Sequence, residues 1–453
     1  MAAAGSSTAA AILLGMGLHS TAQLAQAADK TRAPNVILIL ADDFGYECVG
    51  VDGGTSYKTP NLDKLAAGGV RFDRCYVQPL CTPTRTQLMT GLYNVRNYIE
   101  FGLLDPKATT FAHLFKAAGY VTGISGKWQL GGDGGGGGKF DDPKHFGFDE
   151  YCLWQLTRRG RRYANPQLEC DGKLINDEQG KYGPDVINDY ALDFIKRHKD
   201  QPFMLYYPLM LTHNPYPPTP DSPDWDPKAM GDKVGHAIKH FGDMTQYMDK
   251  LIGTIVDRVE ELGLSQDTLI IFLGDNGTGR DVTSRMGDRV VHGGKGSTTS
   301  AGEHVPMIVR WPGTIAPGKT STDLIDSTDL FPTMCEAANV TIPAALNLDG
   351  HSFYPQLRGE KGKPREWYYS WYGPAGGPTP KGEFAASDRY KLYRDGRFVD
   401  YLADPEEKTE LRDENLPAAA VAAKQMLEGV LEDFKYARPD ALKVPRKAVK
   451  GEQ

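Results

Sequence analysis

The segment Asn35-Val-Ile-Leu-Ile-Leu40, followed by Ala41-Asp42-Asp43, indicates the fold class. Its apolar residues are continuous, without the alternation expected of a strand with one face in water. Such a run is typical of a strand buried on both faces of a parallel or mixed sheet. Residues 203–207 and 268–273 form runs of the same kind. We therefore expect several buried strands.

Helix-like segments lie between these runs. Residues 110–118 and 247–262 have helical character, and each is followed by a glycine, the residue that most often ends a helix. Alternating strands and helices predict an α/β layered fold with a mixed, mostly parallel sheet.

Polar residues follow the buried runs at the points where the strands should end. In α/β folds, functional groups collect beyond the carboxyl ends of the strands. We therefore expect these side chains to meet at one edge of the sheet. They are Asp42 and Asp43 after the first run, Lys127 after residues 121–125, Thr212 and His213 after the run that ends at residue 211, and Asp275 and Asn276 after residues 269–273.

The pattern of apolar and aromatic residues changes at about residue 346. Aromatic-rich runs at 367–372 and 390–393 are separated by glycine, proline and charged turns, and residues 418–434 have helical character. This pattern predicts a small antiparallel sheet with one helix packed on it. We expect a large catalytic domain over residues 33–345 and an α+β subdomain over 346–453.

Composition narrows the function classes. The formal charge of −7 over 453 residues argues against nucleic acid as a partner, because such a partner selects an excess of Lys and Arg.

Residues 1–28 are predicted to be an export signal, with an apolar stretch at 9–18 and the small-x-small pattern Ala25-Gln26-Ala27, although no Lys or Arg precedes Lys30. A disordered tail is the alternative. No later segment has the apolar length of a membrane span, so we expect a periplasmic or extracellular protein.

Six cysteines are present without any Cys-x-x-Cys pair, which argues against a zinc site. In an oxidising compartment we suggest one disulfide, between Cys152 and Cys170.

The string Cys81-Thr-Pro-Thr-Arg85, with Thr90-Gly91 downstream, is the sharpest chemical signal. Pro83 restricts the turn that presents residue 81, and Arg85 places a permanent cation near it. Taken alone, the string would also fit a buried thiol in a loop.

With these residues the chain resembles a type I, formylglycine-dependent, arylsulfatase-like sulfatase of the alkaline phosphatase superfamily, from Pro34 to the carboxyl-terminal subdomain. The resemblance implies a large sheet sandwiched by helices. It also implies that Cys81 is oxidised to formylglycine, whose hydrate supplies the attacking oxygen. A formylglycine-generating maturation enzyme is therefore an expected partner.

The resemblance also implies a metal site. Asp42 and Asp43, in Ala41-Asp-Asp-Phe-Gly45, and Asp275 and Asn276, in Gly-Asp-Asn-Gly, match the family's metal ligands, together with the converted Cys81. Independently, three carboxylates and an amide oxygen form a hard donor set that suits Ca²⁺, and Mg²⁺ less well. Each pair alone would also fit a helix cap or a turn.

Three further residues match sulfate-handling positions of the family. Lys127, in Gly-Lys-Trp, and Lys295, in Gly-Gly-Lys-Gly, correspond to the two lysines that hold the sulfate, where fixed cations stabilise the charge that spreads over its oxygens. His213 corresponds to the histidine beside the bridging oxygen, which can protonate the leaving alcohol. The alternative for His213 is a histidine that caps a strand end.

Two departures from the family pattern stand out. The family string usually continues Gly-Lys-Trp-His, where the histidine helps expel sulfate, but this chain has Gln129. Glutamine cannot act as a base, so we expect another base, such as His292, or a slower release. The second departure lies in residues 297–304, where the family often has an acidic residue at the position of Ser300 and Arg or His at that of His304, which leaves the wall of the pocket open.

A basic, aromatic segment is the candidate for substrate selection. Guanidinium groups clamp sulfates and carboxylates, and aromatic faces stack on sugar rings, so a sulfated glycan would fit. A solvated loop with weak surface ion pairs is the alternative, and the family also contains enzymes for small aryl sulfates. The residues are Arg158, Arg159, Arg161 and Arg162, with Trp154 and Tyr163.

Two other functions remain open from the sequence. A phosphodiesterase or phosphonate hydrolase of the same superfamily would share the metal and the fold. A catalytically impaired, glycan-binding descendant is the second, because Gln129 replaces a catalytic histidine.

Overall fold

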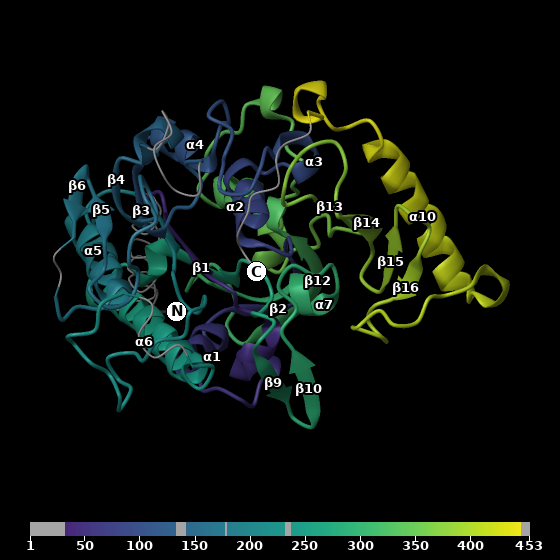
Figure 1. Ribbon diagram of the computed structural model, residues 1–453. Coiled ribbons are helices and arrows are strands. Elements are labelled where there is room, and N and C mark those ends of the chain that lie inside the picture. Colours follow the sequence, from purple (N-terminus) through teal and green to yellow (C-terminus); the bar gives the residue numbers. More distant parts are fainter. Residues whose placement is uncertain (1–31, 133–141, 177–178, 232–236, 445–453) are drawn as a thin grey trace, which may run out of the picture. The chain divides into compact units, whose positions relative to one another are not determined.

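A computed structural model describes residues 32–132, 142–176, 179–231 and 237–444 (Figure 1). The predicted export signal at residues 1–28 lies outside the described residues. From Pro34 onward the described residues form one compact unit, to which all of the following refers.

A ten-stranded sheet, in the order β12-β2-β11-β8-β1-β7-β3-β4-β5-β6, is the largest element. Only β11 and β5 run against their neighbours on both sides, so the predicted mixed, mostly parallel sheet is confirmed. The strands are β1 (Asn35–Ala41), β2 (Val70–Tyr76), β3 (Val121–Lys127), β4 (Glu150–Trp154), β5 (Leu168–Cys170), β6 (Lys173–Ile175), β7 (Phe203–Pro208), β8 (Thr268–Gly274), β11 (His304–Arg310) and β12 (Lys319–Asp326).

Strand β1 explains why its sequence does not alternate. Val36 and Leu38 point into one hydrophobic core and Ile37 and Ile39 into another, and all four are fully buried. Helices cover both faces of the sheet, which removes both from water. They are α1 (Pro60–Ala67), α5 (Gly183–Arg197) and α6 (His240–Glu261) on the Ile37 side, and α2 (Cys81–Thr90), α4 (Phe111–Ala117), α8 (Leu330–Ala337) and α9 (Tyr354–Leu357) on the other.

The two predicted helices are present, with one shifted start. The predicted 110–118 segment is α4, and the Thr110 side chain caps it by accepting from the backbone N–H of His113. The predicted 247–262 segment is the second part of α6. Its first turns were missed because Gly242 weakens the helical pattern, whereas burial of Phe241 in the core supports a helix there.

The carboxyl-terminal part forms the predicted antiparallel sheet and helix. Figure 1 shows α10 (Ala418–Phe434), in yellow, lying along β15 (Tyr390–Tyr393). The sheet order is β13-β14-β15-β16, which also includes β13 (Tyr368–Tyr372), β14 (Gly382–Ala386) and β16 (Phe398–Asp400).

The opposite face of the small sheet packs against the edge of the large one. Tyr368 of β13 stacks on Tyr76 of β2, with ring centroids 4.8 Å apart, and Leu324 of β12 joins the same cluster. This contact brings β13 close to the segment that follows β2. Of the α-helices and strands in the described residues, those not yet named are α3 (Asn94–Asn97), α7 (Ser300–Glu303), and the hairpin of β9 (Thr283–Met286) and β10 (Arg289–His292).

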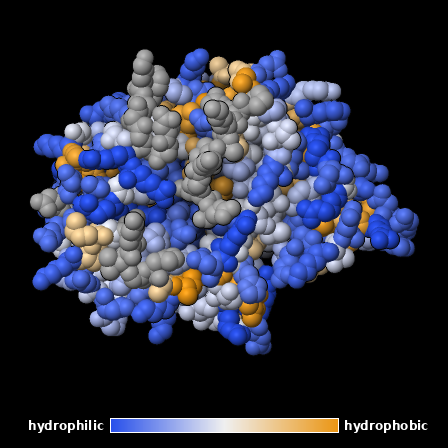
Figure 2. All heavy atoms as spheres, viewed as in Figure 1, coloured by the Kyte–Doolittle hydropathy of each residue, from blue (hydrophilic) through white to orange (hydrophobic). Residues whose placement is uncertain are grey.

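The suggested disulfide between Cys152 and Cys170 is present and joins β4 to β5. Cys48, Cys75, Cys81 and Cys335 are free thiols and buried. In the face shown in Figure 2, hydrophobic residues occur in small separate groups on a largely hydrophilic surface. None of the helices in the described ranges combines the length and hydropathy that a membrane crossing requires.

Candidate active site

One edge of the large sheet gathers the polar residues that the sequence singled out. Because β1, β2, β3, β7 and β8 run in the same direction, their carboxyl ends reach this edge together. The residues that follow these strands are Asp42 and Asp43 after β1, Cys81 after β2, His213 after β7, and Asp275 and Asn276 after β8, while Lys127 is the last residue of β3.

The acidic centre of the site is fully enclosed. Asp42, Asp43, Asp275 and Asn276 are each at most 2% exposed. The backbone N–H of Asp43 donates to Asp275 Oδ1 at 3.0 Å, and Asn276 Nδ2 donates to Asp43 Oδ1 at 2.9 Å. These hydrogen bonds connect the ends of β1 and β8 and fix the orientation of the carboxylates.

Helix α2 brings Cys81 and Arg85 to this centre. The two residues are one helical turn apart and therefore share a face of α2. Arg85 donates from Nε and Nη2 to Asp275 Oδ2 at 3.1 and 2.8 Å, and from Nη1 to the carbonyl of Lys127 at 3.3 Å. The Cys81 sulfur lies within 4.8 Å of carboxylate oxygens of Asp42 and Asp275. The thiol therefore adjoins the acidic centre, at the positive end of a helix dipole.

Lys127 reaches the centre from β3. Its Nζ donates to both carboxylate oxygens of Asp42, at 3.1 and 2.9 Å. The preceding Gly126 has φ +141°, and a Cβ there would lie 1.8 Å from the carbonyl oxygen of Pro208 on β7. Glycine at 126 thus allows β3 to approach β7 closely enough to place Lys127.

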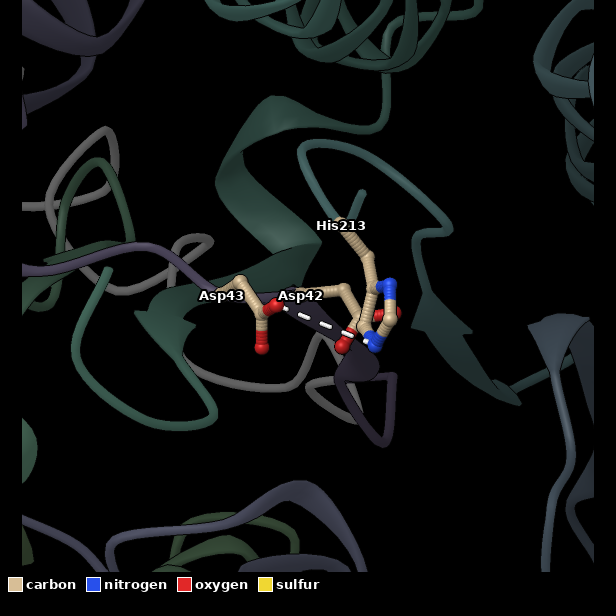
Figure 3. A group of neighbouring side chains, drawn as sticks. All are labelled: Asp42, Asp43 and His213. Carbon is tan, nitrogen blue, oxygen red and sulfur yellow. Dashed lines mark ion pairs between the residues drawn. The ribbon is translucent and has the colours of Figure 1, made fainter. Parts of the chain in front are cut away.

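Lys295 and His213 close the other side. Figure 3 shows the His213 ring directed at the carboxylates of Asp42 and Asp43. Lys295 Nζ donates to Asp43 Oδ2 at 2.9 Å and lies 3.0 Å from His213 Nε2. His213 Nδ1 is 2.6 Å from the carbonyl oxygen of Asn214. This arrangement suits a neutral ring that donates from Nδ1 and accepts at Nε2.

The pKa values follow from burial and from these pairs. Burial acts to raise the pKa of Asp42, but the nearby charges of Lys127 and Arg85 hold it well below its usual range. Burial lowers the pKa of His213 to about 3 and raises that of Cys81 to about 11. Burial and the neighbouring Asp42 raise the pKa of Asp275 to about 7. The unmodified thiol and the imidazole are therefore both neutral at pH 7.

The donor set fits a hard divalent cation. Asn276 Oδ1 is buried, and no group in the described residues donates a hydrogen bond to it. The Nδ2 of the same amide group donates to Asp43, so this oxygen lies close to the Asp43 carboxylate. An enclosed acceptor without a donor is costly unless a cation occupies its lone pairs. Three carboxylates complete an oxygen-rich set of the kind that calcium prefers.

Without a cation, and with all three acids ionised, the formal charges of this centre cancel, since three carboxylates face three basic side chains. A divalent cation would make the centre positive and therefore attractive to an anionic ester. The six residues are Asp42, Asp43 and Asp275, with Arg85, Lys127 and Lys295.

Gln129 contacts the residue at the nucleophile position. It is 2% exposed, with φ +53°, and its Oε1 accepts a hydrogen bond from Cys81 Sγ at 3.2 Å. The departure from the family pattern is thus located in direct contact with residue 81.

The structure does not bring His292 or His304 to this cluster. His292 is exposed at the end of β10, where Nδ1 lies 3.1 Å from Thr283 Oγ1. The His304 ring stacks on both Tyr46 and Tyr76, at 4.1 and 5.0 Å, and burial lowers its pKa to about 4. His304 is therefore a neutral, partly buried residue held between two tyrosines. Neither ring is among the hydrogen-bond partners described for Cys81 and Gln129.

The basic segment divides into exposed and buried members. Arg158 and Arg159 are exposed, and Arg161 donates to the carbonyl of Asn165 at 2.7 Å. Arg162 is only 2% exposed and donates to the carbonyl of Asn214, next to His213. The segment is therefore not one uniform surface patch.

Two residues near Lys295 were not singled out from the sequence. Arg280 Nε donates to the carbonyl of Lys295 at 2.8 Å, and the hydroxyl of Tyr372, at the end of β13, lies beside Gly296. No local pattern could have found Tyr372, because it reaches the site from the carboxyl-terminal sheet.

The Sulfatase family model matches residues 34–340, and the model of N-sulphoglucosamine sulphohydrolase, C-terminal, matches residues 299–433. Arylsulfatase A of Homo sapiens is 34% identical over 411 residues, which cover 83% of this chain and 78% of that protein. N-acetylgalactosamine-6-sulfatase of Canis lupus familiaris is 30% identical over 388 residues, 76% of this chain and 69% of that protein.

The structure is also similar to that of Ps i-CgsB in complex with k-i-k-neocarrahexaose. The TM-score is 0.74 at 23% identity, and the likeness covers 92% of this chain and 96% of that one. This likeness supports the same fold, with helices on both sides of a large mixed sheet and a small carboxyl-terminal sheet.

Proposed function

This chain belongs to the sulfatase family and is a sulfatase, and from that premise we propose that it releases inorganic sulfate from sulfated carbohydrates by way of residue 81. The observation that carries the proposal is the position of the Cys81 sulfur, within 4.8 Å of carboxylate oxygens of both Asp42 and Asp275. A formylglycine made from Cys81 would supply the attacking oxygen in its hydrated form.

Bound Ca²⁺ would be held by Asp42, Asp43, Asp275 and Asn276, and would supply positive charge to the sulfate oxygens. This donor set supports Ca²⁺ over Zn²⁺, because every expected side-chain ligand atom in it is oxygen. The unsatisfied Oδ1 of Asn276 is consistent with such an ion.

The basic side chains position and stabilise the sulfuryl group. Lys127 and Lys295 each have an ammonium group within 3 Å of a carboxylate that also belongs to the cation site. When a cation neutralises those carboxylates, the ammonium groups can donate to sulfate oxygens instead. In an enclosed site such fixed donors stabilise the transition state far more than they would in water. Arg85 holds Asp275 and orients it toward residue 81.

His213 would protonate the leaving alcohol from Nε2. In the ligand-free arrangement the ring is neutral, because burial lowers its pKa to about 3. A bound sulfate ester adds negative charge beside the ring, which raises the pKa of His213 and favours a proton on Nε2. Expulsion of an alcohol then avoids a free alkoxide.

Gln129 would orient the hydrate at residue 81 through its side-chain amide. It cannot accept the proton that a histidine would take, so the step that frees sulfate should be slower than the first step. His292, with Nδ1 3.1 Å from Thr283 Oγ1, has no contact with Cys81 or Gln129 in the described residues, so we do not assign it as the base for this step.

A sulfated sugar is the preferred substrate class. The support comes from relatives whose names specify sulfated sugars, such as N-acetylgalactosamine-6-sulfatase, and from the carbohydrate in complex with Ps i-CgsB. Arylsulfatase A and steryl-sulfatase also match, so small sulfate esters form the comparison class. We place the protein outside the cytoplasm, on the strength of the predicted export signal and the Cys152–Cys170 disulfide.

The test measures inorganic sulfate released from a panel of sulfated oligosaccharides, with protein co-produced with a formylglycine-generating enzyme. Mass spectrometry of the peptide containing residue 81 reports how much aldehyde has formed. Sulfate release that scales with the aldehyde fraction supports the proposal. Equal or faster hydrolysis of matched phosphate esters would instead support a phosphodiesterase, and aldehyde without sulfate release would support a glycan-binding protein.

A further inference from the structure

Arg280 presents an exposed guanidinium group at the edge of the active site. Its Nε donates to the carbonyl of Lys295 at 2.8 Å, which fixes the group beside the lysine that binds Asp43. In the described part of the chain, no carboxylate lies within ion-pair distance of Arg280. A guanidinium group that is held on one side and lacks a carboxylate partner is suited to binding an anion from solution.

Tyr372 brings a phenol to the same place from the other sheet. Its ring is 2% exposed at the end of β13. Within the described ranges its hydroxyl has no hydrogen-bond partner. A hydroxyl in this position can donate to a ligand oxygen.

Gly296 keeps the space between these groups open. It has φ +78°, and the point where a Cβ would lie is 3.3 Å from Arg280 Nη2 and 3.5 Å from the Tyr372 hydroxyl. The backbone N–H of Gly296 donates to the carbonyl of Pro79 at 2.8 Å, two residues before Cys81. The guanidinium of Arg280 and the phenol of Tyr372 therefore both lie beside the backbone of Gly296, where no side chain fills the space. This place adjoins the segment that contains Cys81.

The electrostatic balance of this edge differs from that of the centre. The charge of Lys295 is matched by Asp43, whereas that of Arg280 is not matched by any described carboxylate. Lys381 adds a second exposed cation, with Nζ 5.9 Å from the centroid of the Tyr372 ring, and it too has no carboxylate partner in the described residues. The rim beside Lys295 therefore carries uncompensated positive charge.

We propose that Arg280 and Tyr372 form a subsite for a second anionic group of the substrate, either a carboxylate or a second sulfate close to the ester that is cleaved. Arg280 binds this group through Nη1 and Nη2, and Tyr372 donates to it from its hydroxyl. The inference rests on the proposed function, because it takes the cleaved sulfate to lie against Lys295. It narrows the substrate class to sulfated sugar units that also contain a uronate or a further sulfate.

The test uses matched pairs of substrates that differ in one charge. One pair is a sulfated, uronate-containing disaccharide and its carboxylate methyl ester, and the other is a disulfated sugar and the monosulfated sugar cleaved at the same position. The KM and kcat are measured for the wild type, Arg280→Gln, Arg280→Lys and Tyr372→Phe. Arg412→Gln is the control, because Arg412 is also exposed and loses the same charge.

For Arg280→Gln we expect KM to rise about 10-fold on whichever doubly anionic substrate occupies the subsite, with kcat nearly unchanged, as one charged hydrogen-bonded contact is lost. For the substrate of each pair that lacks the second anionic group, the KM of Arg280→Gln should equal that of the wild type. Arg280→Lys should retain part of the effect, and Tyr372→Phe should raise KM a few-fold. The pair that responds identifies the anion as carboxylate or sulfate.

If Arg280→Gln weakens kcat/KM equally for both members of each substrate pair, the subsite proposal is wrong, since Arg280 would then act only by supporting Lys295. That result would leave sulfate release, and hence the proposed function, intact. If no substrate releases sulfate, the proposed function fails. Calorimetric binding of the uronate and disulfated ligands to Cys81→Ala then decides the subsite: a weaker affinity on adding Arg280→Gln supports it, and an unchanged affinity overturns it.

Discussion

Replacing Lys127 by methionine should destabilise the protein far more than removing a surface lysine with the same kind of partner. Lys127 donates to both oxygens of Asp42, and the two side chains are 1% and 0% exposed. Lys116 pairs with Asp149 at 2.7 Å, but these side chains are 47% and 31% exposed. The two pairs differ mainly in how much water surrounds them.

The magnitude follows from that difference. Removing one partner of a buried pair leaves a poorly compensated charge and costs about 3–5 kcal/mol. Arg85 Nη2 still lies 3.8 Å from Asp42 Oδ1, so Lys127→Met should fall at the lower end of that range. An exposed pair contributes about 0–1 kcal/mol, because water solvates both charges after the change. Relative to a total stability of about 5–15 kcal/mol, only the first change is severe.

The assay is urea denaturation of Lys127→Met and Lys116→Met, each with a calcium chelator and with excess calcium. With the chelator, we expect the free energy of unfolding of Lys127→Met to be much lower than that of Lys116→Met. With calcium this difference should be smaller, because the bound ion compensates the charge of Asp42. Sulfate release by Lys127→Met should fall by about 100-fold or more. A free energy of unfolding for chelated Lys127→Met within about 1 kcal/mol of that for Lys116→Met would refute the assumed charge balance.

Three other changes test separate parts of the site. His213→Gln should lower kcat by about 100-fold or more for sulfated alcohols and much less for 4-nitrophenyl sulfate, whose leaving group needs no proton; equal losses would argue against an acid at 213. Gln129→His should raise the steady-state rate relative to the initial burst, and unchanged phases would remove this residue from the mechanism. Gly126→Ala should cost about 1–3 kcal/mol more than Gly119→Ala in thermal or urea unfolding, because a Cβ at 126 overlaps the carbonyl of Pro208 whereas nothing lies within 4 Å at 119; similar losses would show that β3 can shift.

The sequence predicted the elements whose residues lie in a local pattern. Strand β1 could be found because both of its faces are buried, which leaves a continuous apolar run. The meeting of Asp42 with Asp275 could be predicted because parallel strands deliver their carboxyl ends to one edge. The start of α6 was missed because burial of Phe241, rather than local propensity, stabilises its first turn.

Other features depend on contacts between distant segments. The burial of Arg162 and the packing of His304 between two tyrosines are set by tertiary neighbours, and neither is visible from residue type. Arg280 and Tyr372 are far apart in sequence and meet only because the small sheet packs beside the loop of Lys295. The sequence therefore predicted which residues gather at the centre, but not that Arg280 and Tyr372 lie together at its rim.

The position of calcium relative to residue 81 is the most direct measurement of the central claim. Crystals of the calcium-loaded, aldehyde-bearing protein should show anomalous density at about 2.3–2.6 Å from oxygens of Asp42, Asp43, Asp275 and Asn276, in contact with the converted side chain. Density for the ion at another place, with Asn276 Oδ1 still unliganded, would contradict the account.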